Sequence, residues 1–80
     1  MLAEYINQAL KRAKYEKLDD DGTFVGEVPG LQGVLVNAAT FEACRNEVAS
    51  AVEDWVLFRI ANGMKIPKLG GITVSVTRVG

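Results

Sequence analysis

The order of turns and patterned segments over residues 18–63 most constrains what this chain can fold into. An acidic turn containing Gly22 precedes an alternating segment that stops at Pro29, which lacks the N–H that a strand interior needs. Two glycines then bracket Leu31, a second alternating segment follows, and a long amphipathic pattern runs to about residue 62. Because short strands need an apolar cover, this order predicts a two-layer α+β domain with a helix packed on a small sheet.

The predicted strands are short segments in which side chains alternate between two faces of a sheet. We expect such strands at residues 23–28 and 34–38. Residues 14–18 alternate poorly, and a strand there is favoured by the family resemblance given below, with Gly22 supplying a positive φ in the loop that follows. Leu31 is expected to anchor the next turn in the core. One face of the second strand is expected to carry Phe24, Gly26 and Val28, and one face of the third is expected to carry Val34, Val36 and Ala38.

Two helices are predicted from apolar residues at helical spacing, the first over residues 2–12 and the second over residues 41–62. Thr40 is a suitable N-cap for the second, since its hydroxyl can accept an N–H from the first turn. We expect the buried stripe of this helix to contain Phe41, Cys44, Val48, Val52 and Trp55. Its solvent-exposed face is expected to contain Glu42, Asn46, Ser50, Glu53 and Asp54.

A last strand is predicted over residues 72–79, after a turn at Gly70 and Gly71. Ile72, Val74 and Val76 alternate there with polar residues, which is typical of a strand with one buried face. The whole chain, residues 1–80, therefore reads as a single domain with the element order helix, three strands, helix, strand.

Composition excludes several classes of protein. The chain has 80 residues, one cysteine, no histidine and a formal net charge of −1, so a disulfide framework or a structural zinc site is not expected. The charge argues against direct nucleic-acid binding, and no apolar run has the roughly 18 residues of a membrane span. We expect a cytoplasmic protein without a cofactor. Because a domain this small buries little surface, we also expect a homo-oligomer.

No residues in the sequence form a recognisable catalytic set. Cys44 has no histidine to act as its base, and it falls on the apolar stripe of a predicted helix, which favours a buried structural residue. Glu16, Glu27 and Glu53 are loose carboxylate candidates for a ribonuclease-type site, but their spacing does not force them together. The sequence therefore predicts a protein that is not an enzyme.

The pattern resembles the HicB-like antitoxin family, a UPF0150-type small domain. The resemblance implies a β–β–β–α–β core similar to half of a ribonuclease H fold, oligomerisation, and binding of a small basic ribonuclease toxin of the HicA type. Only residues 65–80 follow the long helix, which is too short for the helix-turn-helix that many such antitoxins carry. The residues that match the family pattern are Gly22, Glu27, Pro29, Leu31, Gly33, Thr40 and Glu42.

Five residues are candidates for protein contacts. Leu57 projects near the polar side of the long helix, and Arg59 projects onto the apolar stripe near its end. For Arg59 we expect the stem to lie on the core and the guanidinium to reach solvent or terminal carbonyls, with an inter-subunit ion pair as the alternative. The last strand adds Ile72, Val74 and Val76.

A stand-alone oligomeric scaffold without a toxin is the alternative function, and a small RNA-processing enzyme ranks third.

Overall fold

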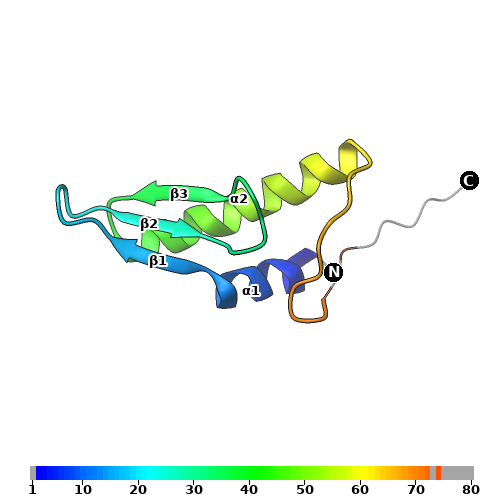
Figure 1. The fold of residues 1–80 in the computed structure, drawn as a ribbon, viewed down its shortest axis with the longest axis horizontal. Coiled ribbons are helices and arrows are strands. Elements are labelled where there is room, and N and C mark those ends of the chain that lie inside the picture. Colours follow the sequence, from blue (N-terminus) through cyan, green and yellow to red (C-terminus); the bar gives the residue numbers. More distant parts are fainter. Residues whose placement is uncertain (1, 73, 75–80) are drawn as a thin grey trace, which may run out of the picture.

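The computed structural model describes residues 2–72 and 74 of the chain. Three strands form one antiparallel sheet in the order β1-β2-β3, and the long helix α2 lies across one face of that sheet (Figure 1). This confirms the predicted α+β arrangement, whereas the comparison with half of a ribonuclease H fold stays a prediction. The elements are α1 (Leu2–Arg12), β1 (Lys14–Lys17), β2 (Phe24–Glu27), β3 (Leu35–Ala38) and α2 (Phe41–Ala61).

The register of the sheet separates a covered face from an open face. Tyr15, Gly26 and Val36 lie opposite one another across the three strands, on the face that α2 covers. The next row contains Lys14, Glu27 and Leu35, whose side chains point to the open face because neighbouring residues of a strand alternate. All three side chains of this second row are exposed.

Gly26 lets α2 approach the sheet closely. A Cβ atom at this position would lie 2.8 Å from Val48 Cγ2, 3.0 Å from Cys44 Sγ and 3.2 Å from Tyr15 Cδ1. These distances are too short for an ordinary carbon contact, so the helix could not pack here against a larger residue. Gly26 itself is buried, on the side of β2 that faces α2.

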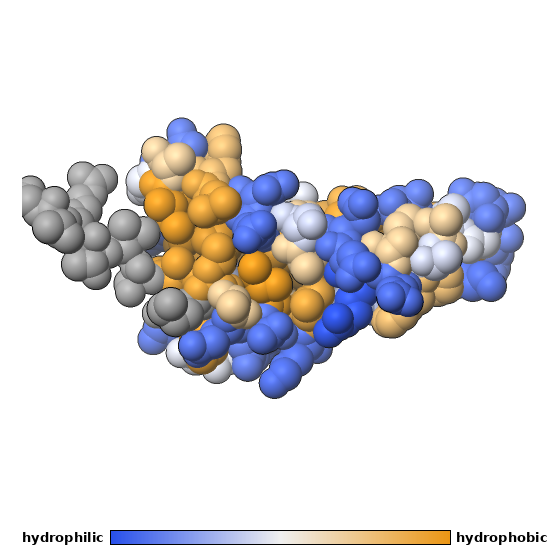
Figure 2. Space-filling model, turned by 180° about the vertical axis from the view of Figure 1, so that it is seen from behind, coloured by the Kyte–Doolittle hydropathy of each residue, from blue (hydrophilic) through white to orange (hydrophobic). Residues whose placement is uncertain are grey.

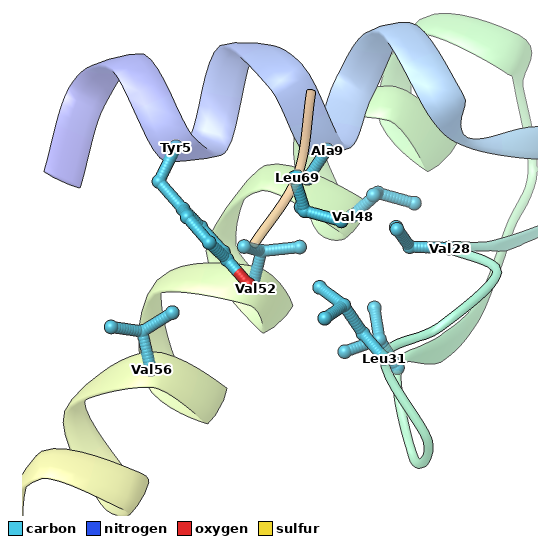
Figure 3. Packing of buried hydrophobic residues seen from close by; sticks show 9 residues of the cluster. Tyr5, Ala9, Val28, Leu31, Val48, Val52, Val56 and Leu69 are labelled. Carbon is cyan, nitrogen blue, oxygen red and sulfur yellow. The ribbon is translucent and has the colours of Figure 1, made fainter. Parts of the chain in front are cut away.

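The turn between β2 and β3 is held to the core by Leu31, as predicted. Its side chain is 2% exposed, and it points from the loop toward α2 (Figure 3). The backbone closes on both sides of it, since Leu31 N–H donates to the Val28 carbonyl and Val34 N–H donates to the Leu31 carbonyl.

The predicted N-cap of α2 is confirmed, because Thr40 Oγ1 accepts a hydrogen bond from the Ala43 N–H at 3.0 Å. The predicted buried stripe is correct in its middle and wrong at both ends. Phe41 is 48% exposed and touches the ring edges of two aromatic residues of the sheet, and Trp55 is half-buried. The buried residues are Cys44, Val48, Val52 and Val56, at a regular spacing of four.

Val56 replaces Trp55 because the second half of α2 packs against α1 rather than against the sheet (Figure 1). The buried residues of α1 are Tyr5 and Ala9. Figure 3 shows the Tyr5 ring lying over the part of α2 that carries Val52 and Val56. Its hydroxyl donates a 2.6 Å hydrogen bond to the carbonyl of Pro67.

The segment after α2 returns to α1 and closes the core. Leu69 is buried, and it exchanges two backbone hydrogen bonds with Ile72, of 3.0 and 2.8 Å. Gly70 and Gly71 between them have φ values of 54° and 79°, as a two-residue type I′ turn requires. This confirms the predicted turn. Most of the strand predicted over residues 72–79 lies outside the described residues.

Candidate protein-binding surface

The C-terminal half of α2 presents carboxylates and apolar side chains together on its exposed side. Glu53 and Asp54 are exposed. Leu57 and Phe58 follow each of them by four residues, and their side chains are 49% and 62% exposed. Residues four apart on a helix are neighbours on its surface, so each carboxylate lies beside an exposed apolar group. We call these four residues the α2 surface.

Hydrophobic residues gather at this end of the molecule. Figure 2 shows a broad hydrophobic area over the C-terminal end of α2 and the segment that follows it, while the opposite end is largely hydrophilic. Met64, just beyond the helix, is 45% exposed and belongs to the same part of the chain. Exposed apolar area that is contiguous and bordered by polar residues is typical of protein-binding sites.

The sequence identified Leu57 as a contact candidate but missed Phe58 and Met64. Phe58 could have been found, because it falls four residues after Asp54 and therefore on the polar side of the helix. Met64 follows the end of the helix, where no helix or strand periodicity predicts which way a side chain points. Its exposure therefore depends on the path of the chain after Gly63.

Arg59 is engaged within its own chain. Its guanidinium carbon lies 4.2 Å from the centre of the Trp55 ring, and Nη1 donates a 3.0 Å hydrogen bond to the Lys65 carbonyl. The Trp55 ring is itself fixed, because its Nε1 donates to the Gln32 carbonyl at 2.8 Å. Arg59 therefore joins the end of α2 to the segment after it, and its guanidinium meets a carbonyl beyond the helix rather than one of the terminal carbonyls of α2.

The other predicted contact residues lie after the Gly70–Gly71 turn. Ile72 and Val74 are half-buried and pack against the core cluster. Val76 lies outside the described residues. The structure thus separates the predicted contact residues, since Leu57 is on the exposed side of α2 while Ile72 and Val74 face the core.

The three loose carboxylate candidates do not meet. Glu16 and Glu27 point to the open face of the sheet, whereas Glu53 is on α2, which covers the opposite face.

Within residues 2–72 and 74, no group of three or more histidine, cysteine, aspartate or glutamate side chains is placed to hold a metal ion. Among those residues there is also no helix of the length and apolar character needed to cross a bilayer.

Cys44 is buried between α2 and the sheet. Burial, with a smaller contribution from the nearby Glu47 carboxylate, raises the pKa of its thiol above the usual range. A raised pKa keeps the sulfur protonated at neutral pH and lowers its reactivity. This agrees with the structural role expected from the sequence.

The fold and the surface define a small α+β domain in which one helix covers a three-stranded sheet and presents an apolar and acidic end. The family profile described as UPF0150-like matches residues 4–67, and the chain belongs to this family. The crystal structure of TTHA0281 from Thermus thermophilus is similar, with a TM-score of 0.85 and 32% sequence identity over 96% of this chain and 95% of that one. A comparison with curated protein sequences returns no match.

Proposed function

We propose that this protein is a HicB-like antitoxin or an orphan relative, which binds and neutralises a small basic ribonuclease of the HicA type through the α2 surface. The observation that carries the proposal is the pairing of exposed Leu57 and Phe58 with the carboxylates one turn before them. Membership of the UPF0150-like family supports it, because the motifs that resemble HicB-like antitoxins lie within the matched residues.

Apolar and acidic groups have different tasks in such a contact. Large apolar side chains that become desolvated supply most of the affinity of an interface. Carboxylates attract a basic partner, speed its approach and discriminate against acidic proteins. Both requirements are met at one end of α2, which is why this end, rather than the charged strand β1, is the proposed contact.

The charge of α2 suits a basic partner. Four carboxylates, from Glu42, Glu47, Glu53 and Asp54, are exposed along the helix. Two arginines oppose them, and one of these, Arg59, is held against Trp55 and the Lys65 carbonyl. The outer side of the helix therefore carries an excess of negative charge.

Neutralisation by this protein would be non-catalytic. Contact with the toxin would cover the basic surface that the toxin needs for RNA, so no chemical step is required of the antitoxin. The separation of Glu16 and Glu27 from Glu53 supports this view, since the chain does not assemble these carboxylates for work on RNA.

The proposal predicts a short basic protein encoded beside the gene for this chain, and co-expression with that protein is the test. Growth arrested by the basic protein alone should be restored by the wild-type chain, and far less by the variant Leu57→Ser/Phe58→Ser. The matched control Asn46→Ala/Ser50→Ala changes exposed residues earlier on the same helix and should restore growth fully. A neighbouring basic protein whose toxicity is unaffected by this chain would favour the stand-alone scaffold instead.

A further inference from the structure

The two edges of the sheet differ in character. At one edge, β1 reads Lys-Tyr-Glu-Lys, and its three charged side chains are all exposed. At the other edge, β3 reads Leu-Val-Asn-Ala and contains neither charge nor proline. Charged residues on an edge strand discourage pairing with another chain, so β1 is protected and β3 is not.

The hydrogen bonding of the sheet shows which backbone groups of β3 are free to pair. The Thr23 carbonyl, just before β2, accepts from the Leu18 N–H on the β1 side at 2.8 Å. Successive residues of a middle strand direct their peptide groups alternately to its two neighbours. The backbone groups of Phe24 and Gly26 therefore form their hydrogen bonds with β3, Phe24 with Ala38 and Gly26 with Val36.

It follows that Leu35 and Asn37 direct their N–H and C=O groups away from β2. In the described part of the chain no strand lies beyond β3, so these two donors and two acceptors face outward. The Asn37 side chain does not cover them, because its Nδ2 turns back to Thr23 Oγ1 and the Phe24 carbonyl, at 2.9 and 3.1 Å. Leu35 beside them is 65% exposed.

We propose that β3 pairs antiparallel with β3 of a second copy of this chain, about a two-fold axis that passes at Val36. In this register, Leu35 of each copy lies opposite Asn37 of the other. The outward groups of both residues are then all used, in four hydrogen bonds, and the two sheets join into one of six strands. The contact is isologous, as two-fold dimers require.

The same features favour a second copy over a basic partner at this edge. The four residues of β3 are uncharged, so pairing the strand with itself places no like charges opposite one another. A basic partner finds no carboxylate on β3 and is drawn to α2 instead. A domain of this size also gains stability from oligomerisation, since its own core is small. The proposal is independent of the toxin-binding function.

One test measures the mass of the full chain by sedimentation over a series of concentrations. The wild type should reach twice the 8.7 kDa of the monomer. Leu35→Pro removes an outward N–H without removing a bond to β2, and should return the mass to that of the monomer. The matched control Lys17→Pro removes an outward N–H from the edge of β1 and should leave the dimer intact. A monomeric wild type, or a dimer that survives Leu35→Pro, would overturn the proposal.

A second test does not depend on proline being tolerated. In a Cys44→Ala background, Val36→Cys places two thiols directly opposite one another across the axis, at a Cα separation suited to a disulfide, roughly 4.5 Å. Mild oxidation should link this variant into covalent dimers. Leu35→Cys should not cross-link, because it faces Asn37 of the second copy. Equal cross-linking of the two variants would show that the register, and with it the proposal, is wrong.

Discussion

At the scale of single residues, Gly26 decides how closely α2 packs on the sheet. The strand needs a residue without a side chain here, because the space that a Cβ would take is filled by Val48, Cys44 and Tyr15. Alternation along the strand correctly groups Gly26 with Phe24 on one face, but it does not say which face the helix covers. It does not predict that the helix comes so near, since that distance is set by side chains from another element.

Gly26→Ala should destabilise the protein by about 1–3 kcal/mol, as overpacking of a tight core does. The closest clash is with Val48 Cγ2, at 2.8 Å. Val48→Ala removes that methyl group, so the double variant should cost less than the sum of the two single changes. The measurement is the free energy of unfolding in urea for the four proteins of this cycle. Strictly additive costs would show that the two positions do not compete for space.

Cys44 gives the protein a predictable response to alkaline pH. Burial raises the pKa of the folded thiol, so the unfolded thiol, with an ordinary pKa of about 8.5, loses its proton first. The contribution of the protonated thiol to folding stability is therefore complete below the pKa of the unfolded thiol, and it is lost as the pH rises through the higher pKa of the folded thiol. Tyr5 and Tyr15 act in the same direction at higher pH, because burial raises their pKa values as well.

Cys44→Ala should reduce this alkaline loss, since the variant has no thiol to ionise. The expected result is a smaller decline in unfolding free energy from pH 7 to about pH 9.5 than in the wild type. Urea titrations of both proteins at the two pH values measure it. An identical decline in the two proteins would mean that the thiol ionises equally in the folded and unfolded states.

At the scale of elements, the helices and strands follow local patterns, but their docking does not. The spacing of apolar residues and the Thr40 cap predict both helices to within about a residue, and alternation predicts β2 and β3. The first strand, β1, alternates poorly and is favoured by the family resemblance. Local patterns do not predict the core role of Tyr5, because its hydroxyl partner, Pro67, is 62 residues away. They do not predict the exchange of Trp55 for Val56 either, because it depends on the packing of α2 against α1, an element far away in the sequence.

Tyr5 joins α1 to the segment that closes the core. Tyr5→Phe removes the hydrogen bond to the Pro67 carbonyl and should cost about 1 kcal/mol. The backbone amides of Leu69 and Ile72 should exchange with solvent faster, because their hairpin follows that contact. Hydrogen exchange with urea unfolding measures both effects.

Tyr15→Phe is the matched control for this change. The Tyr15 hydroxyl is buried and has no hydrogen-bond partner among residues 2–72 and 74, so its removal loses no bond within that part of the chain and relieves a buried polar group. We expect unchanged or higher stability and unchanged exchange at Leu69 and Ile72. A similar loss in the two variants would show that the Pro67 contact contributes nothing of its own.

At the scale of the whole molecule, the two proposed contacts lie at separate places, the α2 surface and the β3 edge. Three of the four residues of the α2 surface could be placed from sequence, since Glu53 and Asp54 fall on the polar side of the helix and Leu57 falls beside it. Phe58 follows the same rule once the position of Asp54 is fixed. The role of Arg59 depends on where the Lys65 carbonyl lies, and this is decided by the path of the chain after the helix.

The measurement that tests the central claim most directly is the affinity of the purified chain for the short basic protein that the proposal predicts beside its gene. Leu57→Ser/Phe58→Ser should weaken binding at least about 30-fold, as the loss of interface hot spots worth about 2 kcal/mol does. Asn46→Ala/Ser50→Ala should bind as the wild type does, and all three affinities should fall as salt screens the carboxylates. Equal affinity of the Leu57/Phe58 variant and the wild type would contradict the account.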